Sequence, residues 1–222
     1  MKINPKFHLS GTAALLMDVA HGSFELGTQQ KLWALCGEDG ALRRLPGVAS
    51  VLLGVNNVAV TFDPLGVRFE ALRDAMAQAW AESTPFLGQG RLVEVPVDYE
   101  ATVDSDLEAV AANAELSIEE TIALHASADY RVACIGWVPG FAFLVGLPPQ
   151  LTTPRRANPR LRVPKGSVGI GGAQTGVIPI DVPSGWNLLG RTTIELFSPG
   201  RANPCLLAPG DRVRFIANST AP

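Results

Sequence analysis

The sequence predicts an α+β fold in two parts, an N-terminal part in which strands and helices alternate and a C-terminal part built from short strands. Hydrophobic residues recur at strand or helix spacing over the first part. From Gly136 to Gly210, by contrast, 75 residues hold 12 of the 22 glycines and 11 of the 17 prolines. Short apolar segments separate these turn residues, as in a β-barrel or sandwich. We therefore expect domains at residues 1–90 and 91–222.

The N-terminal part is predicted from six segments in the order strand, helix, strand, strand, helix, strand. They are Ala13–Val19, Phe24–Leu42, Val48–Leu53, Val58–Phe62, an amphipathic helix from Phe69 to Trp80, and Leu92–Val97. This order is that of the split βαβ, ferredoxin-like fold. Such a fold binds many kinds of ligand or none, so it predicts no activity by itself.

Two short helices are predicted before the C-terminal strands, because two segments match the capping box. Ser105 pairs with Glu108 in the first, and Ser117 pairs with Glu120 in the second, which would extend to about His125. The strands predicted beyond them are Tyr130–Ile135, Phe141–Val145, Ser167–Ile170, Val177–Ile180, Thr193–Phe197 and Val213–Ile216.

Composition argues against several classes of function. The chain is 47% hydrophobic and 18% charged, with a net charge of −3, which describes a folded globule without an affinity for nucleic acid. Its three cysteines are far apart and form no CxxC or Cys/His cluster, so neither a disulfide framework nor a metal site is expected. No apolar run is long enough to span a membrane, and the N-terminus lacks a signal-peptide pattern. We expect a cytoplasmic protein.

Positive charge is concentrated in one stretch. Between Asp129 and Asp181 there is no acidic residue, whereas six residues are basic. The rest of the chain carries −9, from 12 basic and 21 acidic residues. A local excess of one sign attracts small ions of the other sign, so we expect a site for a small anion. The basic residues are Arg131, Arg155, Arg156, Arg160, Arg162 and Lys165.

Two interpretations of this stretch remain open. The run Thr153–Gly166 holds four arginines and one lysine between prolines. A guanidinium group binds a carboxylate or phosphate through two parallel hydrogen bonds, and the prolines would stiffen its support. The alternative is a solvated surface loop whose arginines pair with acidic residues from elsewhere in the chain.

Other residues of this region are candidates for a pocket. Gly166–Gly176 is glycine-rich but lacks the GK[ST] ending of a phosphate loop, so a Walker-type nucleotide site is not expected. Pro139-Gly140 predicts a type II turn, next to Phe141, which would form either an apolar pocket wall or part of the core. His125 is a candidate proton carrier, although a lone helical histidine is more often structural.

The segments LHASADYRVACIGWVPGFAFLVGLP, TPRRANPRLRVPKGSVGIGGAQTGVIPI, PSGWNLLGRT and LLAPGDRVRF closely resemble the family of 5-oxoprolinase B subunits, also described as allophanate hydrolase subunit 1 or as KipI-type kinase inhibitors. The resemblance covers Val95 to about Ile216 and continues more weakly through LPGVASVLLGVNNVAVTFDP. It implies a ferredoxin-like domain followed by a cyclophilin-like β-barrel.

The resemblance also implies a function. Members act with the C and A subunits of 5-oxoprolinase to hydrolyse 5-oxoproline to glutamate at the expense of ATP, so this chain would be a hydrolase subunit that is inactive without its partners. Two alternatives stay open, namely a KipI-type regulator of a sensor histidine kinase and a protein that processes allophanate or a urea derivative.

On this hypothesis the substrate is a small anionic lactam or amide. Its carboxylate, or a phosphorylated intermediate, would bind the arginines, and its amide would contact Gln174 and Thr175 within the glycine-rich segment. The predicted catalytic residues are His125 and Gln174. The predicted substrate-binding residues are Phe141, Arg155, Arg156, Arg160, Thr175, Trp186 and Arg191.

Overall fold

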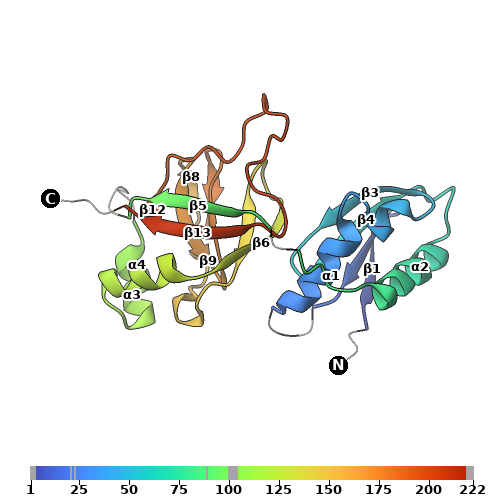
Figure 1. The fold of residues 1–222 in the computed structure, drawn as a ribbon, viewed down its shortest axis with the longest axis horizontal. Coiled ribbons are helices and arrows are strands. Elements are labelled where there is room, and N and C mark those ends of the chain that lie inside the picture. The colour runs from blue at the N-terminus through green and yellow to red at the C-terminus, as the bar shows by residue number, and fades with distance from the viewer. Residues whose placement is uncertain (1–3, 21, 23, 89, 100–104, 219–222) are drawn as a thin grey trace. The chain divides into compact units, whose positions relative to one another are not determined.

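The computed structural model describes residues 4–20, 22, 24–88, 90–99 and 105–218. Tertiary contacts divide the chain into two units, Met1–Gly88 and Gln89–Pro222 (Figure 1). Each unit combines helices with a mainly antiparallel sheet. The mixed α and β content that the sequence predicts is therefore confirmed, and each unit is described separately below.

The first unit is a four-stranded antiparallel sheet in the order β1-β2-β4-β3. Its elements are β1 (Lys6–Ser10), β2 (Ala14–Asp18), α1 (Leu26–Cys36), the 3₁₀ helix η1 (Ala41–Arg44), β3 (Val48–Leu53), β4 (Asn57–Phe62) and α2 (Phe69–Glu82). Alternate residues of β2 and β4, such as Leu15 and Val60, are fully buried with Leu32 of α1 and Met76 of α2. The side chains buried at every second position of these strands therefore pack against the apolar stripe of α2 in one core.

The predicted ferredoxin-like unit is not confirmed, because its last strand is present but belongs to the second unit. Leu92–Val97 is β5 of the second unit, where it pairs in parallel with β13 (Arg212–Ala217). The edge position beside β2 is taken by β1, a strand that the prediction missed. The predicted helix Phe24–Leu42 is also too long, because α1 ends at Cys36 and η1 follows it. Apolar alternation identifies a strand but does not say which sheet it joins.

The second unit contains a seven-stranded sheet in the order β12-β9-β10-β7-β6-β13-β5 and a separate pair, β11-β8. Its elements are β5, α3 (Leu107–Ala114), α4 (Ile118–Ser127), β6 (Tyr130–Ile135), β7 (Ala142–Val145), the 3₁₀ helix η2 (Pro149–Leu151), β8 (Arg160–Val163), β9 (Ser167–Gly171), β10 (Gln174–Val177), β11 (Val182–Ser184), β12 (Asn187–Arg191) and β13. In Figure 1, β5 and β13 run side by side.

The two outermost strands of this sheet are joined to each other. Asp98, directly after β5, and Arg191, at the end of β12, exchange two backbone hydrogen bonds of 2.8 Å. This bridge brings the sheet close to a closed barrel, which removes the unpaired edges of an open sheet. The structure therefore fits the cyclophilin-like barrel that the sequence predicts.

Local predictions for the second unit are confirmed in part. The Ser117–Glu120 capping box is present, with both hydrogen bonds formed, and α4 extends past His125. The box predicted at Ser105 is absent, since Asp106 precedes α3 and Ser105 Oγ accepts from the backbone N–H of Leu107. The glycine-rich segment forms the β9–β10 hairpin. Thr193–Phe197 is not a strand, while β8, β11 and β12 were missed.

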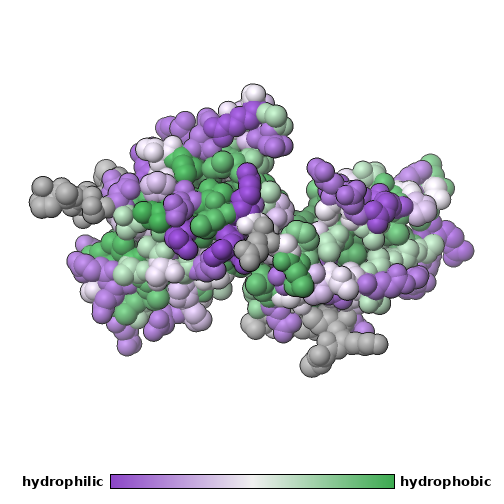
Figure 2. All heavy atoms as spheres, in the orientation of Figure 1, coloured by the Kyte–Doolittle hydropathy of each residue, from purple (hydrophilic) through white to green (hydrophobic). Residues whose placement is uncertain are grey.

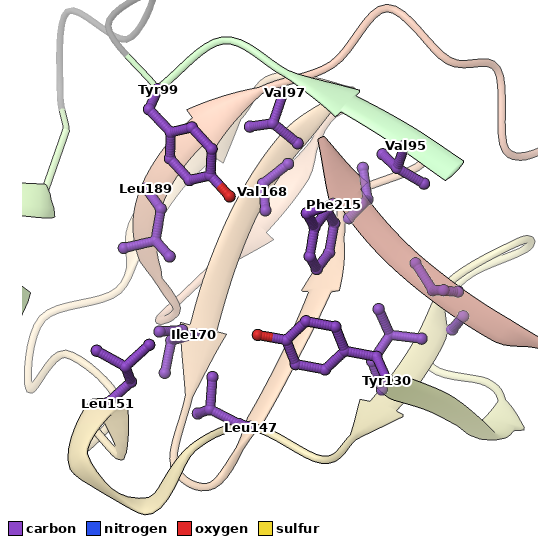
Figure 3. Close-up of a cluster of buried hydrophobic side chains, with 14 of the residues drawn as sticks. Val95, Val97, Tyr99, Tyr130, Leu147, Leu151, Val168, Ile170, Leu189 and Phe215 are labelled. Atoms are coloured by element: carbon purple, nitrogen blue, oxygen red, sulfur yellow. The ribbon is translucent and has the colours of Figure 1, made fainter. Parts of the chain in front are cut away.

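Side chains from opposite sides of the barrel fill its interior. Tyr99, Tyr130 and Phe215 point into it together with valines, leucines and Ile170 (Figure 3). The rings of Tyr130 and Phe215 pack edge to face at 5.2 Å, a preferred geometry for aromatic pairs. The barrel interior is therefore a packed core with its space filled by side chains.

One polar group, the imidazole of His125, is buried within this core. Its Nδ1 lies 2.7 Å from the Tyr99 hydroxyl, and its Nε2 lies 2.9 Å from Thr175 Oγ1. Thr175 donates its single hydroxyl proton to the carbonyl oxygen of Gly169 at 2.9 Å. Thr175 Oγ1 must therefore accept a hydrogen bond from Nε2–H, and the Tyr99 hydroxyl donates a hydrogen bond to Nδ1. The contacts fix the neutral Nε2–H tautomer.

The predicted role of His125 as a proton carrier is contradicted by this geometry. The side chain has no exposed surface, and its ring stacks on Phe215 at 4.6 Å. Burial lowers the pKa of His125 to about 3, because a charged imidazole loses its hydration there. His125 instead satisfies the hydrogen bonds of two neighbouring hydroxyl groups inside the barrel.

Hydrophilic residues are spread over both units on the face drawn in Figure 2. Within the described part of the chain, no helix has the length and apolar character needed to cross a membrane.

We predict that His125 remains in the neutral Nε2–H form from about pH 5 to pH 8. Imidazole ¹⁵N chemical shifts would measure this, with the exposed ring of His8 as the internal reference signal. Because the folded pKa is lowered, only the unfolded state gains this proton, and the free energy of unfolding falls as pH drops below about 6.5. Protonation of His125 at pH 5 would contradict the assignment.

Thr175→Val should lower the free energy of unfolding by about 1–3 kcal/mol, because it leaves the imidazole N–H without an acceptor. Thr121→Val is the matched control. Thr121 is equally buried, but its hydroxyl donates to the Ser117 carbonyl oxygen, which also accepts the backbone N–H of Thr121. Chemical denaturation of both variants would test the difference. Equal losses would argue against a special role for the His125 network.

Candidate functional site

A pocket of about 370 Å³ opens on the second unit beside β11. We name it the Arg155 pocket. It combines aromatic walls, two prolines, one guanidinium group and one hydroxyl group. Its lining residues are Trp137, Phe143, Arg155, Pro159, Pro183, Ser184, Gly185 and Trp186. A small apolar pocket with a few polar groups is the usual form of a small-molecule site.

Three aromatic rings line this pocket, and a fourth, Phe141, packs behind them. Phe141 is fully buried and lies edge to face against Trp137, Phe143 and Trp186, at centroid distances of 5.0, 4.9 and 5.3 Å. Gly171 lets the Trp186 ring approach, since a Cβ atom there would lie 2.6 Å from it. Phe141 thus supports the wall from behind. The prediction that it contacts the substrate is contradicted by its burial.

The loop between β6 and β7 carries Trp137. Val138 N–H donates to the Gly136 carbonyl oxygen at 2.9 Å, which makes a three-residue γ-turn around Trp137 at φ +66°. Phe141 N–H then donates to the Val138 carbonyl oxygen at 3.1 Å, with Gly140 at φ +81°. The Pro-Gly turn predicted from the sequence is therefore confirmed.

Arg155 extends from a backbone that is fixed on both sides. Before it, the Pro154 carbonyl oxygen accepts from Asn187 Nδ2 at 2.8 Å, and after it, Arg156 N–H donates to the Gly185 carbonyl oxygen at 2.7 Å. The Arg155 side chain itself is exposed. Among the residues that the structure describes, it has no carboxylate partner. Its charge is available to an anionic ligand.

Ser184 places a hydroxyl group on the same pocket. Ser184 Oγ accepts from the backbone N–H of Trp186 at 3.2 Å, so its own proton is left to donate. The side chain is almost buried, and its position is set by pairing of β11 with β8 opposite Arg160. The pocket therefore offers one cation and one neutral donor.

The neighbouring arginines do not reach this pocket, and the predicted convergence of guanidinium groups is wrong. Arg156 and Arg160 both bind the carboxylate of Asp106, at 2.5 Å and 2.8 Å. A third donor, the backbone N–H of Leu188, lies 2.8 Å from the same carboxylate. Arg162 pairs with Asp181 at the surface. Asp106, distant in the sequence, thus pairs with two of the arginines that were predicted to hold the substrate, Arg156 and Arg160.

The charge state of Asp106 follows from these contacts. Burial by itself would raise the pKa of this carboxyl group. The hydrogen bonds from Arg160 and Leu188, with the charges of Arg160 and Arg156, outweigh burial and hold the pKa of Asp106 below its usual range. Asp106 is therefore ionised and binds the arginine segment to the start of α3.

The remaining predicted residues are dispersed. Arg191 lies in a separate open pocket of about 760 Å³ that Lys165 also lines. Gln174 is half-exposed at the start of β10 and is not among the residues that line the Arg155 pocket. Thr175 is fully buried against His125, which contradicts its predicted contact with the substrate. Of the predicted set, Arg155 and Trp186 line the same pocket.

Among the pocket residues missing from the predicted set, Trp137 and Ser184 carry the groups that matter most for a ligand. Trp137 stands between Gly136 and the Pro-Gly turn, a position that marks it as a turn residue and thus a loop side chain. Ser184 carries no sequence signal, because its hydroxyl reaches the pocket only through strand pairing. No group of metal-binding side chains is found among the described residues.

Asp106→Asn should lower the free energy of unfolding by about 3 kcal/mol, because two guanidinium groups would keep their charges beside a neutral amide. Asp181→Asn is the matched control. It also removes an arginine-bound carboxylate, but one whose side chain is 41% exposed and whose loss should cost less than about 1 kcal/mol. Urea denaturation would measure both. A small effect at Asp106 would show that the segment is held by other contacts.

Comparison with known proteins agrees with this architecture. The family described as Carboxyltransferase domain, subdomain C and D, matches residues 5–207. The B subunit of 5-oxoprolinase from Escherichia coli O157:H7 is 41% identical over 210 residues, 94% of each chain. Its counterpart from Haemophilus influenzae is 44% identical over 85% of this chain and 86% of its own.

A solved structure of another protein has a similar fold. The Kluyveromyces lactis urea amidolyase matches with a TM-score of 0.82 over 98% of this chain, at 19% identity. This chain spans only 15% of that protein, so the match bears on the fold alone. The near-complete matches to curated relatives establish the family: the chain belongs to the family of 5-oxoprolinase B subunits, within the carboxyltransferase subdomain C and D group.

Proposed function

We propose that this chain is the B subunit of an ATP-dependent 5-oxoprolinase and that it works with the C and A subunits of that enzyme. The reaction would convert 5-oxoproline, ATP and water to glutamate, ADP and phosphate. Family membership supports the assignment, since curated relatives named as 5-oxoprolinase B subunits match most of the chain. The Arg155 pocket supports a role for the second unit in binding the substrate.

The observation that carries this role is the guanidinium of Arg155 at an aromatic pocket, without a carboxylate partner among the described residues. The substrate, 5-oxoproline, is a small flat lactam with one carboxylate. Arg155 would bind that carboxylate through charge-assisted hydrogen bonds, and the aromatic walls would contact the apolar edge of the ring. Ser184 would donate to the lactam carbonyl oxygen. The pocket thus has a complement for the carboxylate, the apolar ring edge and the carbonyl oxygen of the molecule.

The need for ATP follows from the chemistry of the lactam. An amide carbon resists attack by water, because resonance with nitrogen delocalises the charge of the carbonyl. Transfer of the γ-phosphoryl group to the carbonyl oxygen would turn that oxygen into part of a leaving group. A first water would then add to the carbon, and the C–N bond would break with a proton going to nitrogen, which leaves an acyl phosphate. A second water would hydrolyse this acyl phosphate to the carboxylate of glutamate and free phosphate.

We assign no ATP-binding residues to this chain, and nucleotide binding is proposed for the assembled complex. The contribution of this chain would be to hold the substrate. The backbone on both sides of Arg155 is held by hydrogen bonds before the reaction begins, which reduces the free energy lost to reorganisation when its side chain binds a ligand. The contacts of Asp106 with Arg156 and Arg160 would keep the segment that carries Arg155 in place.

We predict that Arg155→Gln in the assembled complex lowers kcat/KM for 5-oxoproline by about ten- to hundredfold, the value of a hydrogen bond to a charged group. The chain would be purified with its C and A partners, and ATP hydrolysis would be followed with and without 5-oxoproline. Arg162→Gln is the matched control, since its side chain lies in the same segment, is 81% exposed and pairs with Asp181. Equal rates for wild type and Arg155→Gln would refute the proposed carboxylate contact.

The same preparation distinguishes the alternatives. ATP hydrolysis that depends on allophanate and not on 5-oxoproline would reassign the substrate. Absence of turnover with both partners, together with stoichiometric inhibition of a sensor histidine kinase, would reassign the chain as a regulator.

A further inference from the structure

Trp137 occupies a backbone conformation that its residue type disfavours. Its φ is +66°, and the hydrogen bond from Val138 N–H to the Gly136 carbonyl oxygen spans only three residues. A γ-turn with positive φ is the rare and strained form of that turn. Among described non-glycine residues, Asn56 and Glu115 also have positive φ. Asn is tolerant of it, and Glu115 caps the end of α3.

The loop around Trp137 holds this conformation in place. Gly136 N–H donates to the Phe141 carbonyl oxygen at 3.0 Å, and Phe141 N–H donates to the Val138 carbonyl oxygen at 3.1 Å. The Pro139-Gly140 turn lies between these bonds, and the fully buried Phe141 anchors the loop to the core. A strained residue persists only where its surroundings over-determine it, and such residues cluster at ligand sites.

Packing does not account for a tryptophan at this position. The Trp137 side chain is 51% exposed, whereas Trp33, Trp80 and Trp186 are at most 7% exposed. Its ring meets Phe141 edge to face at 5.0 Å, a contact that covers only part of the indole. Glycine would meet the backbone requirement without strain. The large ring is therefore held, against the preference of its backbone, where half of it is left uncovered at the Arg155 pocket.

We propose that Trp137 is a specificity-determining residue whose indole stacks on the plane of the substrate amide. This inference rests on the function proposed above and adds a requirement on the ligand, namely a flat amide or lactam plane beside a carboxylate. Arg155 binds the carboxylate, and Trp137 covers the planar part, so both features are needed at once. A carboxylate with a flexible chain in place of the flat ring would lose the second contact.

The physical reasons for this assignment are area and rigidity. An indole offers a wide flat surface and loses little conformational freedom on binding, because its loop already fixes it. Sulfur, aliphatic or small polar side chains would not distinguish a flat amide from a saturated chain of similar size. The strained turn sets the direction of the side chain relative to Arg155.

The test uses the complex with the C and A subunits and compares Trp137→Gly, Trp137→Phe and wild type. Trp137→Gly should raise KM for 5-oxoproline by about tenfold or more, since the stacking surface is lost. It should leave the thermal midpoint of the chain within about 3 °C of wild type, because relief of the strained φ offsets the lost Phe141 contact. Trp137→Phe keeps a ring and should restore KM to within about threefold of wild type.

The outcomes separate the two proposals. If wild type shows 5-oxoproline-dependent turnover and Trp137→Gly keeps its KM within about twofold, the stacking role is wrong and the proposed function stands. If Trp137→Gly no longer assembles with its partners, the side chain contacts a partner protein and the stacking role is wrong. If wild type lacks the activity, the proposed function fails and the inference falls with it.

Discussion

The arrangement of the candidate site depends on the carboxylate of Asp106. It accepts hydrogen bonds from Arg156, Arg160 and the backbone N–H of Leu188. These contacts join the start of α3, the proline-rich arginine segment and β12 within one unit. An ion with several donors compensates the cost of burial better than a single pair does. Because Asp106 fixes Arg156, the next residue along the chain, the exposed Arg155 extends from a rigid support.

The arginines of this segment have divided roles. Arg156 and Arg160 neutralise a buried carboxylate, and Arg162 pairs with Asp181 at the surface. Arg155 has no such partner among the described residues, and it is the one that lines the aromatic pocket. A cation serves a ligand only where the fold leaves it unpaired. Three of the six basic residues of this stretch therefore pair with carboxylates, and Arg155 would give the stretch a binding function.

Polar and aromatic groups have different surroundings in the barrel interior and in the pocket loop around Trp137. Inside the barrel, His125, Tyr99 and Thr175 satisfy each other in their neutral forms, so this polar group contributes rigidity without charge. At the pocket, Trp137 is held in an unfavourable conformation with much of its ring uncovered. Satisfied buried groups indicate a role in stability, whereas a strained exposed ring indicates a role in recognition.

The sequence alone determined the family, the α and β content, the barrel strand Tyr130–Ile135 and the Pro139-Gly140 turn, because these depend on neighbouring residues and on motifs. Tertiary structure decided the rest. Apolar alternation marked Leu92–Val97 as a strand, but only pairing with β13 placed it in the barrel. Charge along the chain suggested that arginines gather on a ligand, but Asp106 lies 50 residues from Arg156 and meets it only in the fold. Pairing across such separations leaves no local pattern, since it depends on which surfaces the folded chain brings together.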